Sequence, residues 1–331
     1  ALPVVLQDPN VDAVIVIFVP VVGIDEAEVG AAISRGATAA GEKPVLCTFL
    51  SARGAPPALR SAANVPSFSY PEAAARALGR AAERGEWLHR PAGTLPHPEV
   101  DARTAARVID DVLGDREEAW LDPPQTRALL DAYGIPLVPE RVARTADDAV
   151  AAARELGFPV VVKTATAGAH KTESGGVALN LADEAAVRSA AERIGLPVLV
   201  QPMVRGGAEL LAGVVQDPVF GPLVAFGPGG VFAELIGQAQ FQLAPLTDLD
   251  ARELLRGGKA GRLVAGFRGN PPADENALVD LLERLSVLAH EHPEIAELDL
   301  NPVLALPDRA VAVDARVRVA RHAPTARAKS W

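Results

Sequence analysis

Apolar and polar positions divide the first 90 residues into short strand-like runs and longer amphipathic stretches. Three nearly continuous apolar runs have the length and composition of strands in a parallel sheet: residues 11–20, 43–50 and 65–70. The stretches 25–41 and 71–88 that follow them have the pattern and boundary residues of helices. This order predicts the second half of a flavodoxin-like domain over residues 1–95. Half of such a sheet has a bare edge, so we expect further sequence before Ala1.

A different pattern begins after a proline-rich connection at residues 90–100. A helix is predicted at 101–113, within a linker over 96–117. Further helices are predicted at 122–135, 145–157, 182–194, 247–257 and 275–292. Strands are predicted at 159–163, 176–181, 197–204, 208–217, 222–227, 295–306 and 310–320, and an extended stretch at 233–246. Helix–strand pairs followed by mostly antiparallel strands indicate an α+β domain over 118–331, with two lobes facing each other across a cleft.

Composition narrows the classes of function. The 331 residues are 49% hydrophobic and carry a formal net charge of −10, so a large core can form and no basic surface for nucleic acid is expected. No apolar run reaches the ~18–20 residues that a membrane span needs, and no signal peptide precedes the first strand. A single cysteine, Cys47, allows no disulfide within the chain, which favours a cytoplasmic protein.

Lys163 ends a strand of three valines and precedes a loop of small residues, "TATAGAHKTESGG". A lysine in this place is a suitable point charge for a phosphate. A loop with Gly175 and Gly176 can bring backbone N–H groups close to phosphate oxygens. A lysine whose ammonium merely reaches water would show the same pattern by itself. The lysine and the glycine loop together indicate a phosphate-bearing ligand.

Acidic and amide side chains alternate with leucines in "ELDLNP". Glu297, Asp299 and Asn301 would lie on one face of a strand, with the leucines facing the core. Asp314 would lie beside Asn301 if its strand pairs antiparallel with this one. Carboxylate and amide oxygens, completed by substrate phosphates, suit Mg²⁺, so Asn301 and Asp314 are candidate metal ligands. The alternative is an acidic, solvated edge strand.

The predicted strand at 197–204 breaks at Gln201-Pro202-Met203, which has the character of a hinge between lobes. Gln201 and Met203 could contact the edge of an adenine, and Glu209 could accept hydrogen bonds from ribose hydroxyls. A core strand followed by a turn explains the same residues without a ligand. The glycine-rich stretch 217–235 either covers a phosphate or only connects two strands.

These segments occur in an order that resembles a known family. The lysine-bearing strand, "AHKTESGGV", "VLVQPMVRGGAELLAGVVQDPVFGPLVAFGPGG", "LAPLTD", "ELDLNP" and "VDARV" resemble the ATP-grasp domain of the NDP-forming (ADP-forming) acyl-CoA synthetases. This family includes acetate–CoA ligases and is related to succinyl-CoA synthetase. The resemblance covers residues 118–320. It implies a partial flavodoxin-like parallel-sheet domain followed by a two-lobed ATP-grasp domain, with Mg²⁺ and ATP or ADP as cofactors.

The resemblance also assigns roles to residues. His170 matches a histidine that carries a phosphoryl group, and Asp299 matches the carboxylate that orients this phosphohistidine. The other matches are Lys163, Gly175 and Gly176 at the phosphates, Gln201, Met203 and Glu209 at the adenine and ribose, and Asn301 and Asp314 at Mg²⁺. Two places depart from the family pattern: Pro228 replaces a bulky residue in "GPGG", and Gly237-Gln238 stand where an acidic residue is usual.

Two main functions are open at this point. The first is the nucleotide-binding part of an acyl-CoA synthetase, in which phosphoryl transfer through a phosphohistidine is linked to ligation of an acid to CoA. The second is a catalytically silent, ligand-sensing module of a protein lysine acetyltransferase, because the chain most resembles proteins that join a GNAT acetyltransferase domain to this module. A carboxylate–amine ligase is a third, although it would not need His170.

The expected partners follow from the same resemblance. CoA and a small carboxylic acid would bind through domains that precede Ala1 in the family, so the chain alone is expected to be inactive. Members of the family often form oligomers, which makes a homo-oligomer plausible. The acyl group and the choice between ADP and GDP are not determined by the sequence.

Overall fold

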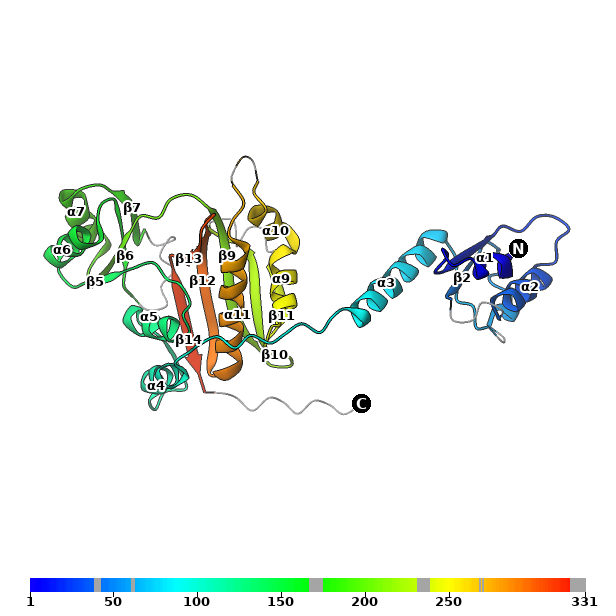
Figure 1. Ribbon diagram of the computed structural model, residues 1–331, viewed down its shortest axis with the longest axis horizontal. Coiled ribbons are helices and arrows are strands. Elements are labelled where there is room, and N and C mark those ends of the chain that lie inside the picture. Colours follow the sequence, from blue (N-terminus) through cyan, green and yellow to red (C-terminus); the bar gives the residue numbers. More distant parts are fainter. Residues whose placement is uncertain are drawn as a thin grey trace. The chain divides into compact units, whose positions relative to one another are not determined.

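The structure is a computed structural model that describes residues 1–38, 43–60, 63–166, 175–230, 239–267, 269 and 271–321. The chain divides into two compact units, Ala1–Pro91 and Ala92–Trp331 (Figure 1). In the part of the chain that is described, no helix combines the length and apolar character needed to cross a membrane.

The first unit is a three-stranded parallel sheet with helices. Its elements are α1 (Leu2–Gln7), β1 (Val14–Phe18), α2 (Glu26–Thr38), β2 (Val45–Phe49), a 3₁₀ helix at Pro57–Arg60, β3 (Ser67–Phe68) and α3 (Pro71–His89). The sheet order is β1-β2-β3, and both pairings are parallel. All five residues of β2 are buried, as expected of a central parallel strand. The predicted strands and helices are present, and α1 is an additional element.

The second unit contains the remaining elements. Its helices are α4 (Ala102–Leu113), α5 (Pro123–Ala132), α6 (Ala146–Leu156), α7 (Glu184–Ile194), α9 (Asp248–Arg256), α10 (Gly258–Val264) and α11 (Glu275–Glu291). Its strands are β4 (Glu118–Trp120), β5 (Arg141–Ala143), β6 (Val160–Thr164), β7 (Val177–Leu181), β8 (Val198–Pro202), β9 (Ala208–Asp217), β10 (Gly221–Pro228), β11 (Gln240–Leu243), β12 (Ile295–Ala305), β13 (Ala310–Ala312) and β14 (Ala315–Ala320). They form two sheets.

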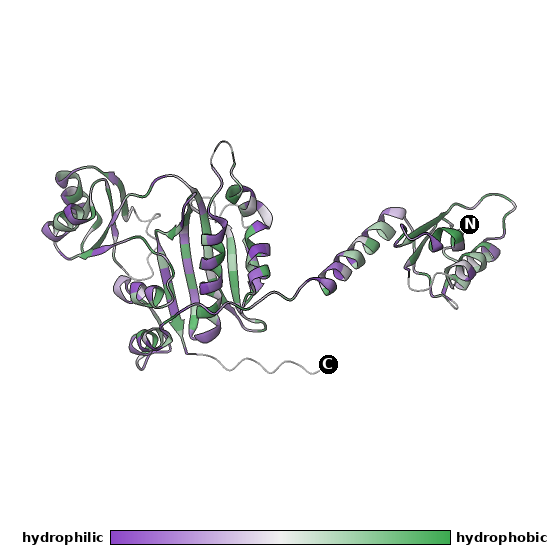
Figure 2. Cartoon of the chain, viewed as in Figure 1, coloured by the Kyte–Doolittle hydropathy of each residue, from purple (hydrophilic) through white to green (hydrophobic). Residues whose placement is uncertain are grey.

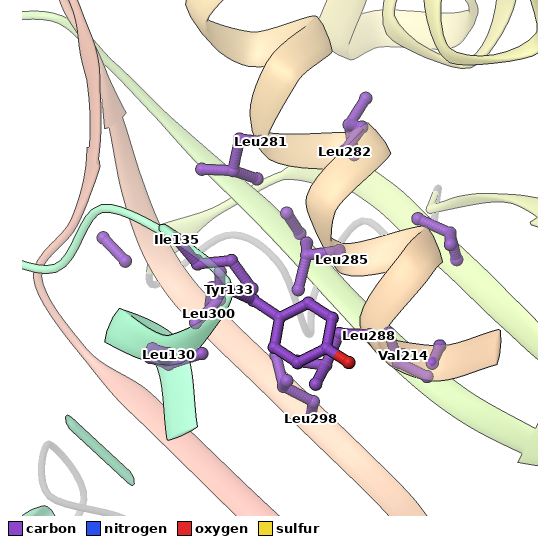
Figure 3. Close-up of a cluster of buried hydrophobic side chains, with 14 of the residues drawn as sticks. Leu130, Tyr133, Ile135, Val214, Leu281, Leu282, Leu285, Leu288, Leu298 and Leu300 are labelled. Atoms are coloured by element: carbon purple, nitrogen blue, oxygen red, sulfur yellow. The ribbon is translucent and has the colours of Figure 1, made fainter. Parts of the chain in front are cut away.

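The larger sheet has the order β11-β10-β9-β12-β14-β4, with β13 also paired to β12. Its core lies against α9, α10 and α11, where Leu298 and Leu300 of β12 meet the leucines of α11 (Figure 3). The alternation of apolar and polar residues along β12 and β14 is visible in Figure 2. The predicted inward direction of Leu298 and Leu300 is confirmed, since each is at most 1% exposed. Glu297, Asp299 and Asn301 therefore lie on the opposite face.

The smaller sheet has the order β5-β8-β6-β7, and α6 and α7 pack on one of its faces. Val160 and Val162 of β6 and Val198 and Val200 of β8 form the core with these helices. Because side chains alternate along a strand, the intervening residues face the other way. These are Val161 and Lys163 on β6, paired with Gln201 and Leu199 on β8. We call this sheet with α6 and α7 the small lobe, and the rest of the second unit the large lobe.

Local sequence explains where several helices begin. The predicted capped helix at 122–135 starts with a capping box formed by Asp122 and Gln125, and Thr145–Asp148 and Thr247–Asp250 form two more. The short elements β4, β5 and α10 do not follow from the hydrophobic pattern. The predicted extended stretch at 233–246 is described only from residue 239, where it contains β11.

Candidate functional site

A hollow lies between the small and the large lobe. The large lobe contributes Leu121, Pro123, Thr126, Leu137, Asp314, Ala315 and Arg316. The small lobe and its approach contribute Glu140, Thr166 and Leu199. The predicted cleft therefore lies where the strand-end lysine and the "VDARV" segment meet.

Lys163 joins the two lobes at the centre of this region. Its side chain is 6% exposed, its ammonium donates a hydrogen bond to the carbonyl of Val313, and Nζ lies 3.4 Å from Oδ1 of Asp314. A lysine that only reaches solvent would keep its ammonium in water, so that alternative is wrong. Burial of an ammonium is tolerated only beside anionic or polar partners. The ammonium therefore has its partners on the large lobe, and it brings a positive charge from the small lobe to the point where the lobes meet.

Asn301 and Asp314 lie side by side, as predicted. The backbone N–H of Asn301 donates to the carbonyl of Asp314 over 3.3 Å. The side-chain oxygen of Asn301 accepts from the N–H of Gly230 over 2.9 Å, which ties the "GPGG" turn to this point. Gly230 has φ +70°, and a Cβ there would lie 2.0 Å from a carboxylate oxygen of Glu209. The turn therefore requires glycine, and it brings Glu209 close to Asn301.

Asp299 forms an ion pair on the same face of β12. Its Oδ2 accepts from a guanidinium nitrogen of Arg316 over 3.0 Å, and both side chains are about four-fifths buried. Burial raises the pKa of the Asp299 carboxyl above its ordinary range, and the hydrogen bond from Arg316 acts in the opposite direction. Glu297 of β12 and Arg318 of β14 form a similar ion pair at the neighbouring position of the same two strands. The acidic strand is thus a ladder of paired charges rather than a solvated edge.

Of the predicted hinge residues, Gln201 contacts the cleft residue Glu140. Gln201 is 3% exposed, and its Nε2 donates to Oε2 of Glu140 over 2.7 Å. The backbone N–H of Met203 donates to the carbonyl of Pro159 over 2.9 Å. The donor of Met203 is therefore already used within the small lobe, and the polar feature of the hinge is the side chain of Gln201.

The glycine loop is anchored next to Lys163. The N–H of Thr164 donates to the carbonyl of Gly176 over 2.9 Å, and Gly175 has φ +69°. His170, like Gly237 and Gln238, lies outside the described residues.

The cleft is also lined by residues that the sequence analysis did not single out, among them Glu140, Thr166 and Arg316. Arg316 stands two residues after Asp314, so strand alternation was a signal that could have found it. Glu140 precedes a three-residue strand, and Thr166 belongs to the segment that the sequence predicts as a glycine loop. Neither residue has a distinguishing pattern. Within the described residues, no three His, Cys, Asp or Glu side chains are grouped as a metal site. The oxygens of Asn301 and Asp314 fit Mg²⁺ only as a partial ligand set that a phosphate completes.

A family model described as an ATP-grasp domain matches residues 113–319. The chain belongs to this family. The large and small lobes are therefore the two lobes of an ATP-grasp domain, and the predicted fold class is confirmed.

Curated relatives place this ATP-grasp domain among ADP-forming acyl-CoA ligases. Acetate–CoA ligase [ADP-forming] I of Archaeoglobus fulgidus is 32% identical over 96% of this chain and 47% of that protein. The beta subunit of acetate–CoA ligase [ADP-forming] I of Pyrococcus furiosus is 38% identical over 61% of this chain and 92% of that protein. The chain thus spans about half the length of the single-chain relative.

A solved structure supports the same assignment. Acetyl-coenzyme A synthetase 1 from Ca. Korarchaeum cryptofilum, in complex with coenzyme A and Ca-AMPCP, is 39% identical, with a TM-score of 0.59. The match covers 64% of this chain and 99% of that chain. A second structure of that protein holds Mg-AMPPCP, with its phosphohistidine segment pointing towards the nucleotide-binding site, at 40% identity and a TM-score of 0.56.

Proposed function

We propose that this chain is the nucleotide-binding part of an ADP-forming acyl-CoA synthetase and that its cleft binds Mg-ATP or Mg-ADP. The observation that carries the proposal is Lys163. Its ammonium is buried at the junction of the lobes, 3.4 Å from Asp314, which itself adjoins Asn301. A cation and two oxygen ligands for Mg²⁺ at one point match the charge distribution of a metal-bound triphosphate.

Each residue then has a defined task. Lys163 neutralises phosphate oxygens, and Gly175 and Gly176 let the loop backbone approach them. Asn301 and Asp314 would hold Mg²⁺, which would neutralise part of the negative charge of the phosphates. Met203 and Gln201 border the base, and Glu209 faces the ribose.

The chemical step uses His170. A nitrogen lone pair of its imidazole attacks the γ-phosphorus of ATP, the bond from this phosphorus to the β,γ-bridging oxygen breaks, and ADP leaves. Asp299 accepts a hydrogen bond from the other ring nitrogen and so stabilises the positive charge that develops on the ring. The phosphoryl group then passes to a carboxylic acid, and the acyl phosphate reacts with the thiol of CoA to give acyl-CoA and phosphate.

The CoA and acid sites are proposed to be supplied by another part of the enzyme. One relative is named as a beta subunit and another is about twice the length of this chain. No observation on the described residues favours the sensing alternative. That alternative and the fusion to an acetyltransferase stay predictions from the sequence.

A labelling experiment tests the proposal. The full-length protein is incubated with γ-labelled ATP and Mg²⁺, and the label on protein is followed in acid and in base. We expect an acid-labile, base-stable label that is lost in His170→Gln. The matched control is His290→Gln, at an exposed histidine in the last turn of α11, which should retain the label. Binding of Mg-ATP without any label in the wild-type protein would contradict the phosphohistidine step.

A further inference from the structure

A carboxylate fixes the orientation of the Gln201 amide. Nε2 of Gln201 lies 2.7 Å from Oε2 of Glu140, and Gln201 is 3% exposed. An ionised carboxylate has no hydrogen to donate, so only the NH₂ end of the amide can face it. The amide oxygen is consequently held on the other side.

Glu140 is itself held in place from the large lobe. One of its oxygens lies 3.9 Å from the guanidinium of Arg127, and the Glu140 side chain is 10% exposed. The same guanidinium donates to the carbonyls of Leu137 and Val138. Arg127 therefore supplies a counter-charge for a largely buried carboxylate, and its hydrogen bonds to Leu137 and Val138 fix the segment that leads to it.

The amide oxygen of Gln201 remains available for a ligand. Among the described residues it accepts no hydrogen bond, and it is not one of the two buried side-chain atoms that lack a partner there. The oxygen is therefore not fully enclosed, although the residue as a whole is only 3% exposed. The main chain has fewer hydrogen-bonding groups available for a ligand. Gln201 pairs with Val161 in the sheet, and the N–H of Met203 donates to the carbonyl of Pro159.

We propose that Glu140 is a positioning residue that makes the cleft selective for 6-aminopurine nucleotides over 6-oxopurine nucleotides. The inference rests on the proposed nucleotide site and adds the identity of the base. The 6-amino group of adenine donates a hydrogen bond, whereas the 6-oxo group of guanine accepts one. An amide oxygen whose orientation is fixed by Glu140 accepts a hydrogen bond from the 6-amino group and is repelled by the 6-oxo group. A freely rotating amide could serve both.

The test is the ratio of dissociation constants for Mg-GTP and Mg-ATP, measured by calorimetry on the full-length protein. We expect the wild-type protein to bind Mg-ATP at least about tenfold more tightly, because a mismatched acceptor pair leaves a buried polar group unsatisfied. Glu140→Gln lets the Gln201 amide rotate, since the new amide can donate as well as accept. We expect the ratio to fall about tenfold, mainly through tighter binding of Mg-GTP.

A matched control makes the same chemical change elsewhere. Glu155→Gln alters an exposed carboxylate on α6 that pairs with Arg141 and should leave the ratio at the wild-type value. An unchanged ratio in folded Glu140→Gln, or equal affinities in the wild-type protein, would overturn the inference.

Two further outcomes keep the inference separate from folding and from the proposed function. If Glu140→Gln does not fold, Gln201→Met removes the whole amide, its acceptor included, and should reduce the ratio by weakening the binding of Mg-ATP; an unchanged ratio would again overturn the inference. If the wild-type protein binds neither nucleotide, the proposed nucleotide site itself is wrong. If both nucleotides bind and the ratio of their dissociation constants does not change in Glu140→Gln, only the role of Glu140 is wrong.

Discussion

The two lobes present different chemistry to the cleft between them. The small lobe presents the apolar Val161 and Leu199, with one ammonium and one amide among them. The large lobe presents carboxylates and guanidinium groups, such as the pair of Asp299 and Arg316, beside apolar residues such as Leu121 and Leu137. An apolar surface with one amide suits a purine base, and a charged surface suits a metal-bound phosphate chain. Under the proposed function, the small lobe would contact the base and, through Lys163, the phosphates, whereas the large lobe would hold the metal through Asn301 and Asp314.

The cores behind these surfaces also differ. The large lobe is built around leucines of α11, β12 and their neighbours, whereas the small lobe is built from valines and alanines. Small side chains bury less apolar surface per residue, so single truncations should cost less in the small lobe.

The largest expected effect comes from truncation in these two cores. Leu298→Ala, at a residue 1% exposed, should lower the free energy of unfolding by about 2–5 kcal/mol. Val162→Ala in the small lobe should lower it by about 2 kcal/mol. Chemical denaturation of both variants measures the difference. A greater loss in the small lobe would contradict the comparison.

The next effect concerns the metal ligands of the large lobe. The double variant Asn301→Ala, Asp314→Asn should bind Mg-ATP at least about tenfold more weakly, because two oxygen ligands of the metal are lost or weakened. With EDTA present, its affinity for ATP should equal that of the wild-type protein. Asp308→Asn, in an exposed turn, is the control. An equal loss with EDTA would assign both residues a structural role.

Most of the fold, but only part of the cleft, could be predicted from the sequence. The hydrophobic pattern located nearly every helix and strand. Apolar residues recur about every 3.6 residues in the helices, and they alternate or form continuous runs in the strands. It missed β4 and β5, which have three residues each and exist only through pairing with β14 and β8. Asn301 and Asp314 could be paired from strand alternation alone. Glu140 could not be found, because its role depends on Gln201, 61 residues later.

A smaller effect should appear in the pH dependence of stability. Burial raises the pKa of Asp299, more than its hydrogen bond with Arg316 lowers it. The folded state then binds more protons than the unfolded state, so ionisation of Asp299 lowers stability as the pH rises above the ordinary value of 3.8. The free energy of unfolding of the wild-type protein minus that of Asp299→Asn should fall as the pH rises above the ordinary value of 3.8. Denaturation at a series of pH values measures it, and a rising difference would show that Arg316 dominates.

The smallest effect is expected on the outer face of the small lobe. Arg154 and Glu184 form an ion pair between α6 and α7, with side chains 63% and 48% exposed. Water and salt screen such a pair, so Arg154→Gln should unfold at the same denaturant concentration as the wild-type protein. A clear loss of stability would mean that exposed ion pairs, and not only the buried ones of the cleft, stabilise the folded lobes.

The most direct test of the account is the binding of Mg-ATP to Lys163→Met, measured by calorimetry. Methionine keeps most of the length and the apolar stem of the side chain and removes the charge together with the hydrogen bond to Val313. The control is Lys259→Met, at an exposed lysine of α10. If the cleft between the lobes holds the phosphates, Lys163→Met loses Mg-ATP binding while the control retains the wild-type affinity. Wild-type affinity in folded Lys163→Met would place the nucleotide elsewhere and contradict the account.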